Sequence, residues 1–201
     1  MPLSHHAARA ALAAFTLAGI GYAAPPPSGA PGAMLLLGCL SSGDGYLHAK
    51  LGGAIDARID WPNSGTRCEG NVREEPPGIR LSFQRISRAS PDLLFVFGIS
   101  GVKEGRPARE AGVNLTVIVQ GTSKIFGTMG DSRCTVDSLT QTPLPAKRLY
   151  RVEARGFCTQ PAHAVRGKDT LLVSTFEFAG SVSYEVPKDP THPFVVPKTS
   201  P

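Results

Sequence analysis

The chain of 201 residues carries a formal net charge of +5, and 41% of its residues are hydrophobic and 18% charged. This composition excludes wholesale disorder, and 22 glycines and 18 prolines are too few for a collagen-like protein. The length allows one domain of ordinary size or at most two small ones. Because the basic residues are spread along the chain and form no concentrated stripe, we expect no nucleic-acid partner.

Residues 1–23 have the features of a secretory signal peptide. An arginine precedes an apolar stretch that is too short for a membrane span, and small residues precede a cleavage site between Ala23 and Ala24. Residues 24–45 then form a Pro/Gly-rich spacer followed by a short apolar segment. The sequence therefore predicts a periplasmic or secreted protein, and the Ala/Gly/Pro-rich signal region is typical of bacteria.

The tetrad Leu36-Leu37-Gly38-Cys39 resembles a bacterial lipobox, in which the cysteine becomes the lipidated N-terminus. The resemblance implies an alternative in which Cys39 anchors the protein to a membrane. In lipoprotein signals the apolar region runs straight into this motif, whereas here the Pro/Gly-rich spacer interrupts it. We therefore favour an ordinary cysteine, and expect a membrane partner only if Cys39 is lipidated.

From Tyr46 onward, apolar and polar residues alternate with a period of two, which is typical of half-buried β-strands. The predicted strands include residues 53–61, 79–86, 93–99, 113–119, 124–128, 148–158 and 170–186. About eight strands and no helical periodicity predict a single all-β domain over residues 46–186. We expect an antiparallel β-sandwich, with a small closed barrel as the alternative.

The two ends of this domain are also predicted. Residues 53–61 and 176–184 share a glycine followed by alternating residues, so we expect these two segments to pair and close the fold. Residues 187–201 contain five prolines and are expected to form an extended, disordered tail.

The four cysteines are expected to form disulfides, because thiols pair in the oxidising compartment that an exported protein enters. Three pairings are possible. We favour Cys134 with Cys158, because both flank neighbouring strands, and this choice leaves Cys39 with Cys68. No metal site is expected, since there is no C-x-x-C pair and the histidines lack ligand-like spacing.

Two sets of residues could support a hydrolase. Asp56 and Asp60 share one face of a predicted strand, but about 13 Å would separate them, which is wider than a glycosidase pair needs. Ser132 follows a Gly-Asp pair without a Gly-x-Ser-x-Gly elbow, which favours a turn. A hydrolase would require one of these residues to lie in a cleft near His48, His163 or another carboxylate.

The most charged stretch is the loop of residues 101–112, where Lys103, Arg106 and Arg109 are the candidate binding residues. Loops on rigid β scaffolds often carry binding. Together these patterns predict an exported, non-catalytic binding or envelope-associated protein without a cofactor. Its partner is expected to be an envelope or extracellular ligand, and catalysis by Ser132 or Asp56/Asp60 is the enzymatic alternative.

Overall fold

The computed structural model describes residues 39–85 and 92–185. The strands in these ranges are β1 (Tyr46–Gly53), β2 (Ala57–Pro62), β3 (Thr66–Arg73), β4 (Gly78–Arg85), β5 (Leu93–Ser100), β6 (Ala111–Val119), β7 (Ile125–Gly127), β8 (Cys134–Pro143), β9 (Leu149–Cys158), β10 (Ala162–Ala164) and β11 (Thr170–Ser183). Within the described ranges, no helix is long and apolar enough to cross a membrane. The predicted signal peptide (1–23) and tail (187–201) lie outside the described residues.

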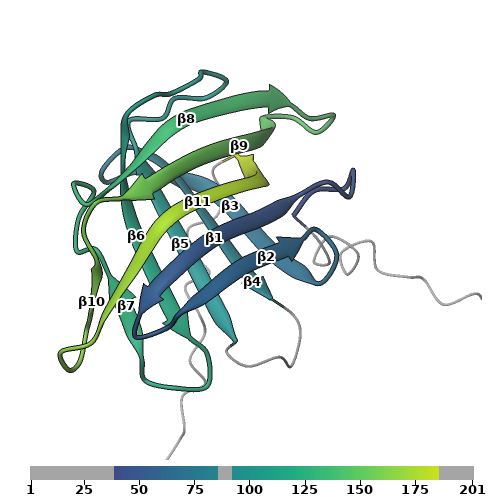
Figure 1. The fold of residues 1–201 in the computed structure, drawn as a ribbon. Coiled ribbons are helices and arrows are strands. Elements are labelled where there is room, and N and C mark those ends of the chain that lie inside the picture. The colour runs from purple at the N-terminus through teal and green to yellow at the C-terminus, as the bar shows by residue number, and fades with distance from the viewer. Residues whose placement is uncertain (1–38, 86–91, 186–201) are drawn as a thin grey trace, which may run out of the picture. The chain divides into compact units, whose positions relative to one another are not determined.

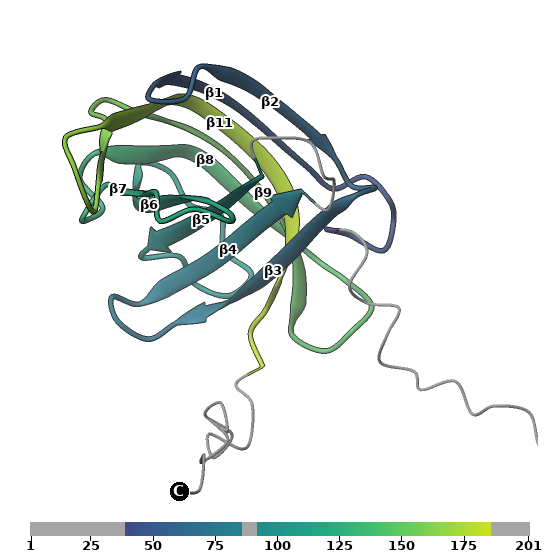
Figure 2. The same ribbon diagram turned by 90° about the horizontal axis from the view of Figure 1, so that it is seen from below.

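The eleven strands form one sheet that closes on itself. Hydrogen bonds run from β11 through β3, β4, β5, β6, β8 and β9 and back to β11, so seven strands make a closed barrel. The β1–β2 hairpin extends from β11, and β7 and β10 form a second bridge between β6 and β11. In Figure 1, β8, β9, β11, β1 and β2 lie side by side in front of β3 to β6. Figure 2 shows the same strands curving around the interior.

This hydrogen-bonding pattern fits the barrel alternative, and the predicted two-sheet sandwich is not confirmed. The reason lies in β11, whose 14 residues are long enough to pair with several strands and so close the sheet into a barrel. Residues 171–179 of β11 pair with β1, and its first two residues pair with β10. Residues 176–183 pair with β9, and Ser183 also pairs with Asn71 of β3. Gly70 lets β3 approach closely, because a Cβ there would collide with the carbonyl oxygen of Ser181.

The predicted strand at residues 53–61 is divided in the structure. Gly53 has a φ of +106°, a left-handed conformation that favours glycine, and a bend follows before β2 begins at Ala57. The predicted pairing of 53–61 with 176–184 is therefore wrong, because β1 pairs with β11 and separates β2 from it. Within β2, Ile59 and Trp61 lie on the inward face and are both buried.

A cluster of phenylalanines fills the barrel. The ring of Phe97 lies 5.0 Å from those of Phe176 and Phe178 and 6.0 Å from that of Phe83, measured between centroids. All four side chains are buried, which accounts for a large part of the hydrophobic stabilisation. On the outer face of β5, however, Val96 is only half-buried, so this strand is not fully covered on both faces.

Two disulfides tie the sheet together. Cys134 and Cys158 are register partners in the β8–β9 ladder, and their bond crosses that strand pair. Cys39 and Cys68 join the segment before β1 to β3. Both pairs are the ones that the sequence favoured, and no cysteine of the described ranges is free.

Candidate functional site

A groove of about 580 Å³ crosses the outer face of β2, β1, β11, β9 and β8. Its floor consists of small or apolar groups, and its sides carry charged, polar and aromatic groups. The lining residues are His48, Ala49, Lys50, Arg58, Ile59, Asp60, Asp137, Arg155, Gly156, Phe157, Thr175, Phe176 and Glu177. Small-molecule sites commonly combine an apolar surface with a few polar groups in this way.

Two β-bulges lie beside the groove. Asp137 is the extra residue in β8 opposite β9, and Ser174 is the extra residue in β11 opposite β1. Bulges bend a strand and re-aim its side chains, and they are common next to functional sites. At the floor, Gly156 has no room for a side chain, because a Cβ there would collide with the carbonyl oxygen of Thr135 and with the ring of Phe176.

Five polar side chains form a row across the groove, one from each strand. The order is Asp60, His48, Glu177, Arg155 and Asp137, since neighbouring strands place these residues in register or at the bulge. His48 Nε2 lies 3.2 Å from Asp60 Oδ1, and Arg155 Nε lies 3.4 Å from Asp137 Oδ2. The side chains at each end of this row thus contact one another in pairs, which leaves Glu177 in the middle.

Tyr46 supports the middle of the row. Its hydroxyl donates a hydrogen bond to Glu177 Oε1 at 3.0 Å, and its ring stacks on that of His48 with 4.6 Å between centroids. Burial, and then the neighbouring Glu177 carboxylate, raise the pKa of Tyr46 to about 12. Tyr46 therefore remains a hydrogen-bond donor at physiological pH and holds Glu177 in place.

A second row lies next to the first along the strands. Arg58 and Lys50 are register partners in β2 and β1, and Lys50 faces Thr175 in β11. Phe157 stands on the β9 side of the groove and is 42% exposed. Among the phenylalanines, tyrosines and tryptophans at 39–85 and 92–185, it is the only exposed one. A smaller hollow of about 200 Å³, lined in part by Tyr46, Glu177 and Arg155, adjoins the groove.

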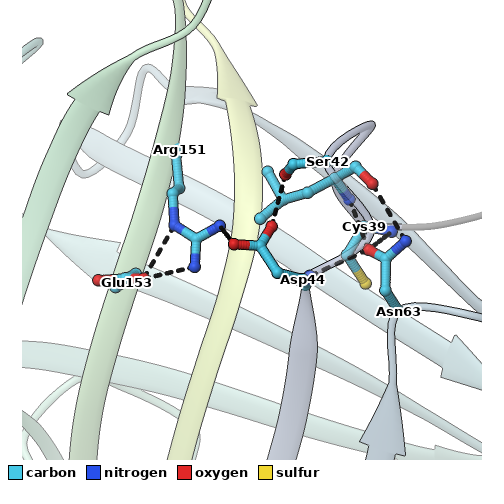
Figure 3. Close-up of polar contacts among 8 residues, drawn as sticks. Cys39, Ser42, Asp44, Asn63, Arg151 and Glu153 are labelled. Atoms are coloured by element: carbon cyan, nitrogen blue, oxygen red, sulfur yellow. Dashed lines mark hydrogen bonds and ion pairs between the residues drawn. The ribbon is translucent and has the colours of Figure 1, made fainter.

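A second polar cluster, which we call the N-terminal clamp, holds residues 39–45 with Asn63 and Arg151 (Figure 3). The buried side chain of Asn63 accepts hydrogen bonds from the backbone N–H groups of Cys39 (2.9 Å), Leu40 (2.8 Å) and Gly45 (3.2 Å). Its Nδ2 donates to the carbonyl of Leu40 at 3.0 Å. Both the oxygen and the nitrogen of the amide are hydrogen-bonded to this segment, so the role of Asn63 is structural.

The charged side chains on the exposed side of the clamp also have partners. Arg151 in β9 contacts Asp44 Oδ2 at 2.6 Å and donates through Nε to Glu153 at 2.8 Å (Figure 3). The hydroxyl of Ser42 donates to Asp44, and this bond, followed by Arg151, lowers the pKa of the Asp44 carboxyl. Every charge here has a partner within the clamp.

The structure separates the residues of the predicted catalytic sets. Ser132 is exposed in a bend between β7 and β8, and Asp56 lies in the bend between β1 and β2. Neither lines the groove. Asp60 does line it, and its contact with His48 is the one element of the hydrolase hypothesis that the structure brings together. His163 lies in β10 and not in the groove.

The predicted binding loop lies elsewhere. Lys103, Arg106 and Arg109 are exposed between β5 and β6, and none lines the groove. The backbone carbonyls of Lys103 and Arg106 accept hydrogen bonds from Gln141 Nε2 at 2.8 and 2.7 Å, so this loop is fastened to β8. A binding role for its three basic side chains stays a prediction.

Sequence reasoning missed the groove because its residues come from five strands between positions 48 and 177. One signal was available: alternation along residues 148–158 puts Phe157 on the polar face with Arg151 and Glu153. Over the described parts of the chain, no group of three or more His, Cys, Asp or Glu side chains could hold a metal ion. Comparison with protein-family models, curated proteins and solved structures finds no match to this chain.

Proposed function

We propose that the protein is an exported, non-catalytic module that binds a saccharide chain in the outer-face groove. The observation that carries this proposal is Phe157, an exposed aromatic ring beside a row of hydrogen-bonding side chains. A sugar ring has apolar C–H faces and hydroxyl edges, so it can stack on Phe157 while Glu177 and Arg155 bind its hydroxyls. The apolar floor adds contact area.

The groove offers weak support for catalysis. Nucleophilic catalysis requires a base within hydrogen-bond reach of the nucleophile. Thr175 is the lining residue whose hydroxyl could act as the nucleophile, and the described residues show no hydrogen bond between Thr175 and His48. The His48–Asp60 pair is exposed at the edge of the sheet, which favours a surface ion pair.

Export is supported by the two disulfides, which persist in oxidising compartments. The Cys39–Cys68 disulfide argues against the lipid-anchor alternative, because a thioether-linked lipid and this disulfide would both need the sulfur of Cys39. Intact mass spectrometry separates the two. We expect a soluble form without acyl mass that gains four hydrogen atoms on reduction.

The binding proposal can be tested by recording amide NMR spectra of the wild-type protein during titration with oligosaccharides. We expect shifts confined to the groove strands, weakened in Phe157→Ala and unchanged in Met129→Ala, which removes an exposed apolar side chain elsewhere. Shifts that avoid the groove would contradict the proposal. Cleavage of a bound saccharide that is lost in both Asp60→Asn and His48→Ala would replace it with the hydrolase alternative.

A further inference from the structure

We propose that the saccharide held in the groove is acidic and that Lys50 and Arg58 bind its anionic groups; this inference rests on the proposed function. Lys50 and Arg58 stand directly opposite each other in the β1–β2 ladder, and both are exposed. Like charges in this arrangement destabilise a sheet. An anion bound between them would remove the repulsion. Binding sites often keep such arrangements, which are unfavourable for the fold when no ligand is bound.

The other basic side chains of the groove already have acidic partners. His48 lies against Asp60, and Arg155 lies against Asp137. Among the described residues, neither Lys50 nor Arg58 has a carboxylate within ion-pair distance. Their positive charges are therefore available to a ligand, and they lie in the same row as Thr175 and within the same groove as Phe157.

The neighbouring row restricts the ligand further. Glu177 is one row away, about 7 Å along the strands, and its carboxylate has a hydrogen bond only from Tyr46 in the described structure. A carboxylate repels a second anion and accepts hydrogen bonds from hydroxyl groups. The ligand therefore carries a negative group at Lys50 and Arg58 and hydroxyls at Glu177. An acidic saccharide meets both requirements, whereas an acidic peptide offers repeated carboxylates and few hydroxyls.

The ligand class is tested with the full mature protein and five immobilised polymers. Hyaluronan, polygalacturonate and dextran sulfate are acidic saccharides, dextran is a neutral saccharide, and poly-L-glutamate is an acidic peptide. We expect at least one acidic saccharide to bind at least tenfold more tightly than dextran, with affinity falling as NaCl rises from 20 to 500 mM, because salt screens exposed charges. Binding to poly-L-glutamate as tight as to the best saccharide would overturn the proposal in favour of a peptide. No preference of any acidic saccharide over dextran would overturn it as well.

The residues are tested with a matched pair of double variants. Lys50→Gln/Arg58→Gln is expected to weaken binding to the best acidic saccharide about five- to tenfold and to flatten its salt dependence. Lys147→Gln/Arg166→Gln removes the same charges from exposed loop positions outside the groove and is expected to bind like the wild type. Equal losses in both variants would show attraction to net charge and overturn the assignment. Circular dichroism and thermal unfolding confirm that each variant is folded.

Failure of this inference is distinguishable from failure of the proposed function. If dextran binds as well as the acidic polymers and Phe157→Ala weakens dextran binding, the groove binds saccharides but is not selective for acidic ones. If Phe157→Ala and Lys50→Gln/Arg58→Gln both leave every polymer unaffected, the groove is not the binding site and both proposals fail.

Discussion

The N-terminal clamp and the groove are two polar clusters that share strand β9, and they differ in how their members are partnered. In the clamp, Asn63 satisfies backbone groups on every side, and Asp44 and Arg151 neutralise each other. In the groove, Lys50 and Arg58 repel each other. Saturated polar groups stabilise a fold, while unsaturated ones on an exposed face are available to a ligand.

The largest effect is expected from removing the disulfide that fixes the clamp to β3. Cys39→Ala/Cys68→Ala opens a link with a sequence separation of 29 residues, for which the chain-entropy model gives about 3.5 kcal/mol of stability. Urea unfolding at pH 7 measures this loss. Because the bond lies outside the groove, saccharide binding below the unfolding transition should be unchanged, and a loss of binding would show that the two regions are coupled.

The next largest effect is expected at the centre of the clamp. Asn63→Ala leaves the N–H groups of Cys39, Leu40 and Gly45 without their acceptor, which is expected to cost about 2–3 kcal/mol. The exposed Asn71→Ala serves as the control and should stay within about 0.5 kcal/mol of the wild type. Similar losses in the two variants would remove the distinction between a saturated cluster and an ordinary surface.

In the groove, removal of a charged side chain is expected to increase the stability of the fold. Arg58→Thr removes a like-charge pair and adds a residue that favours strands, so we expect the free energy of unfolding to rise by about 0.5 kcal/mol. Arg155→Thr, which loses the contact with Asp137, should not be stabilised. A clear destabilisation of Arg58→Thr would mean that Arg58 serves the fold and not a ligand.

The smallest effect concerns pH. Because Ser42 and Arg151 lower the pKa of Asp44 from its ordinary value of 3.8, the ionised carboxyl stabilises the fold above that value, and the contribution is lost as pH falls through the lowered pKa. The melting temperature of Asp44→Asn should therefore lie below that of the wild type at pH 6, with the gap closing toward pH 3. A gap that is constant between these values would contradict the ionic origin of the contact.

The sequence predicts strands wherever period-two alternation coincides with a buried face, as along residues 79–86 and 113–119. It failed at residues 53–61, because Ile55 keeps the alternation in phase through the bend that separates β1 from β2. The barrel closure and the groove could not be predicted, since both depend on the register between strands distant in sequence. Asp60, His48 and Glu177 become neighbours only through two such ladders.

The position of β11 at the end of the described barrel has a consequence for how the chain can be shortened. This strand pairs with β1, β3, β9 and β10, which all precede it in the sequence. A fragment that ends before Thr170 leaves those four strands with open edges, and open edges pair with other chains. Truncations that remove β11 should therefore yield aggregates and no smaller folded unit. Pairing of β11, the last strand of the described residues, is thus the step that makes folding of the barrel cooperative.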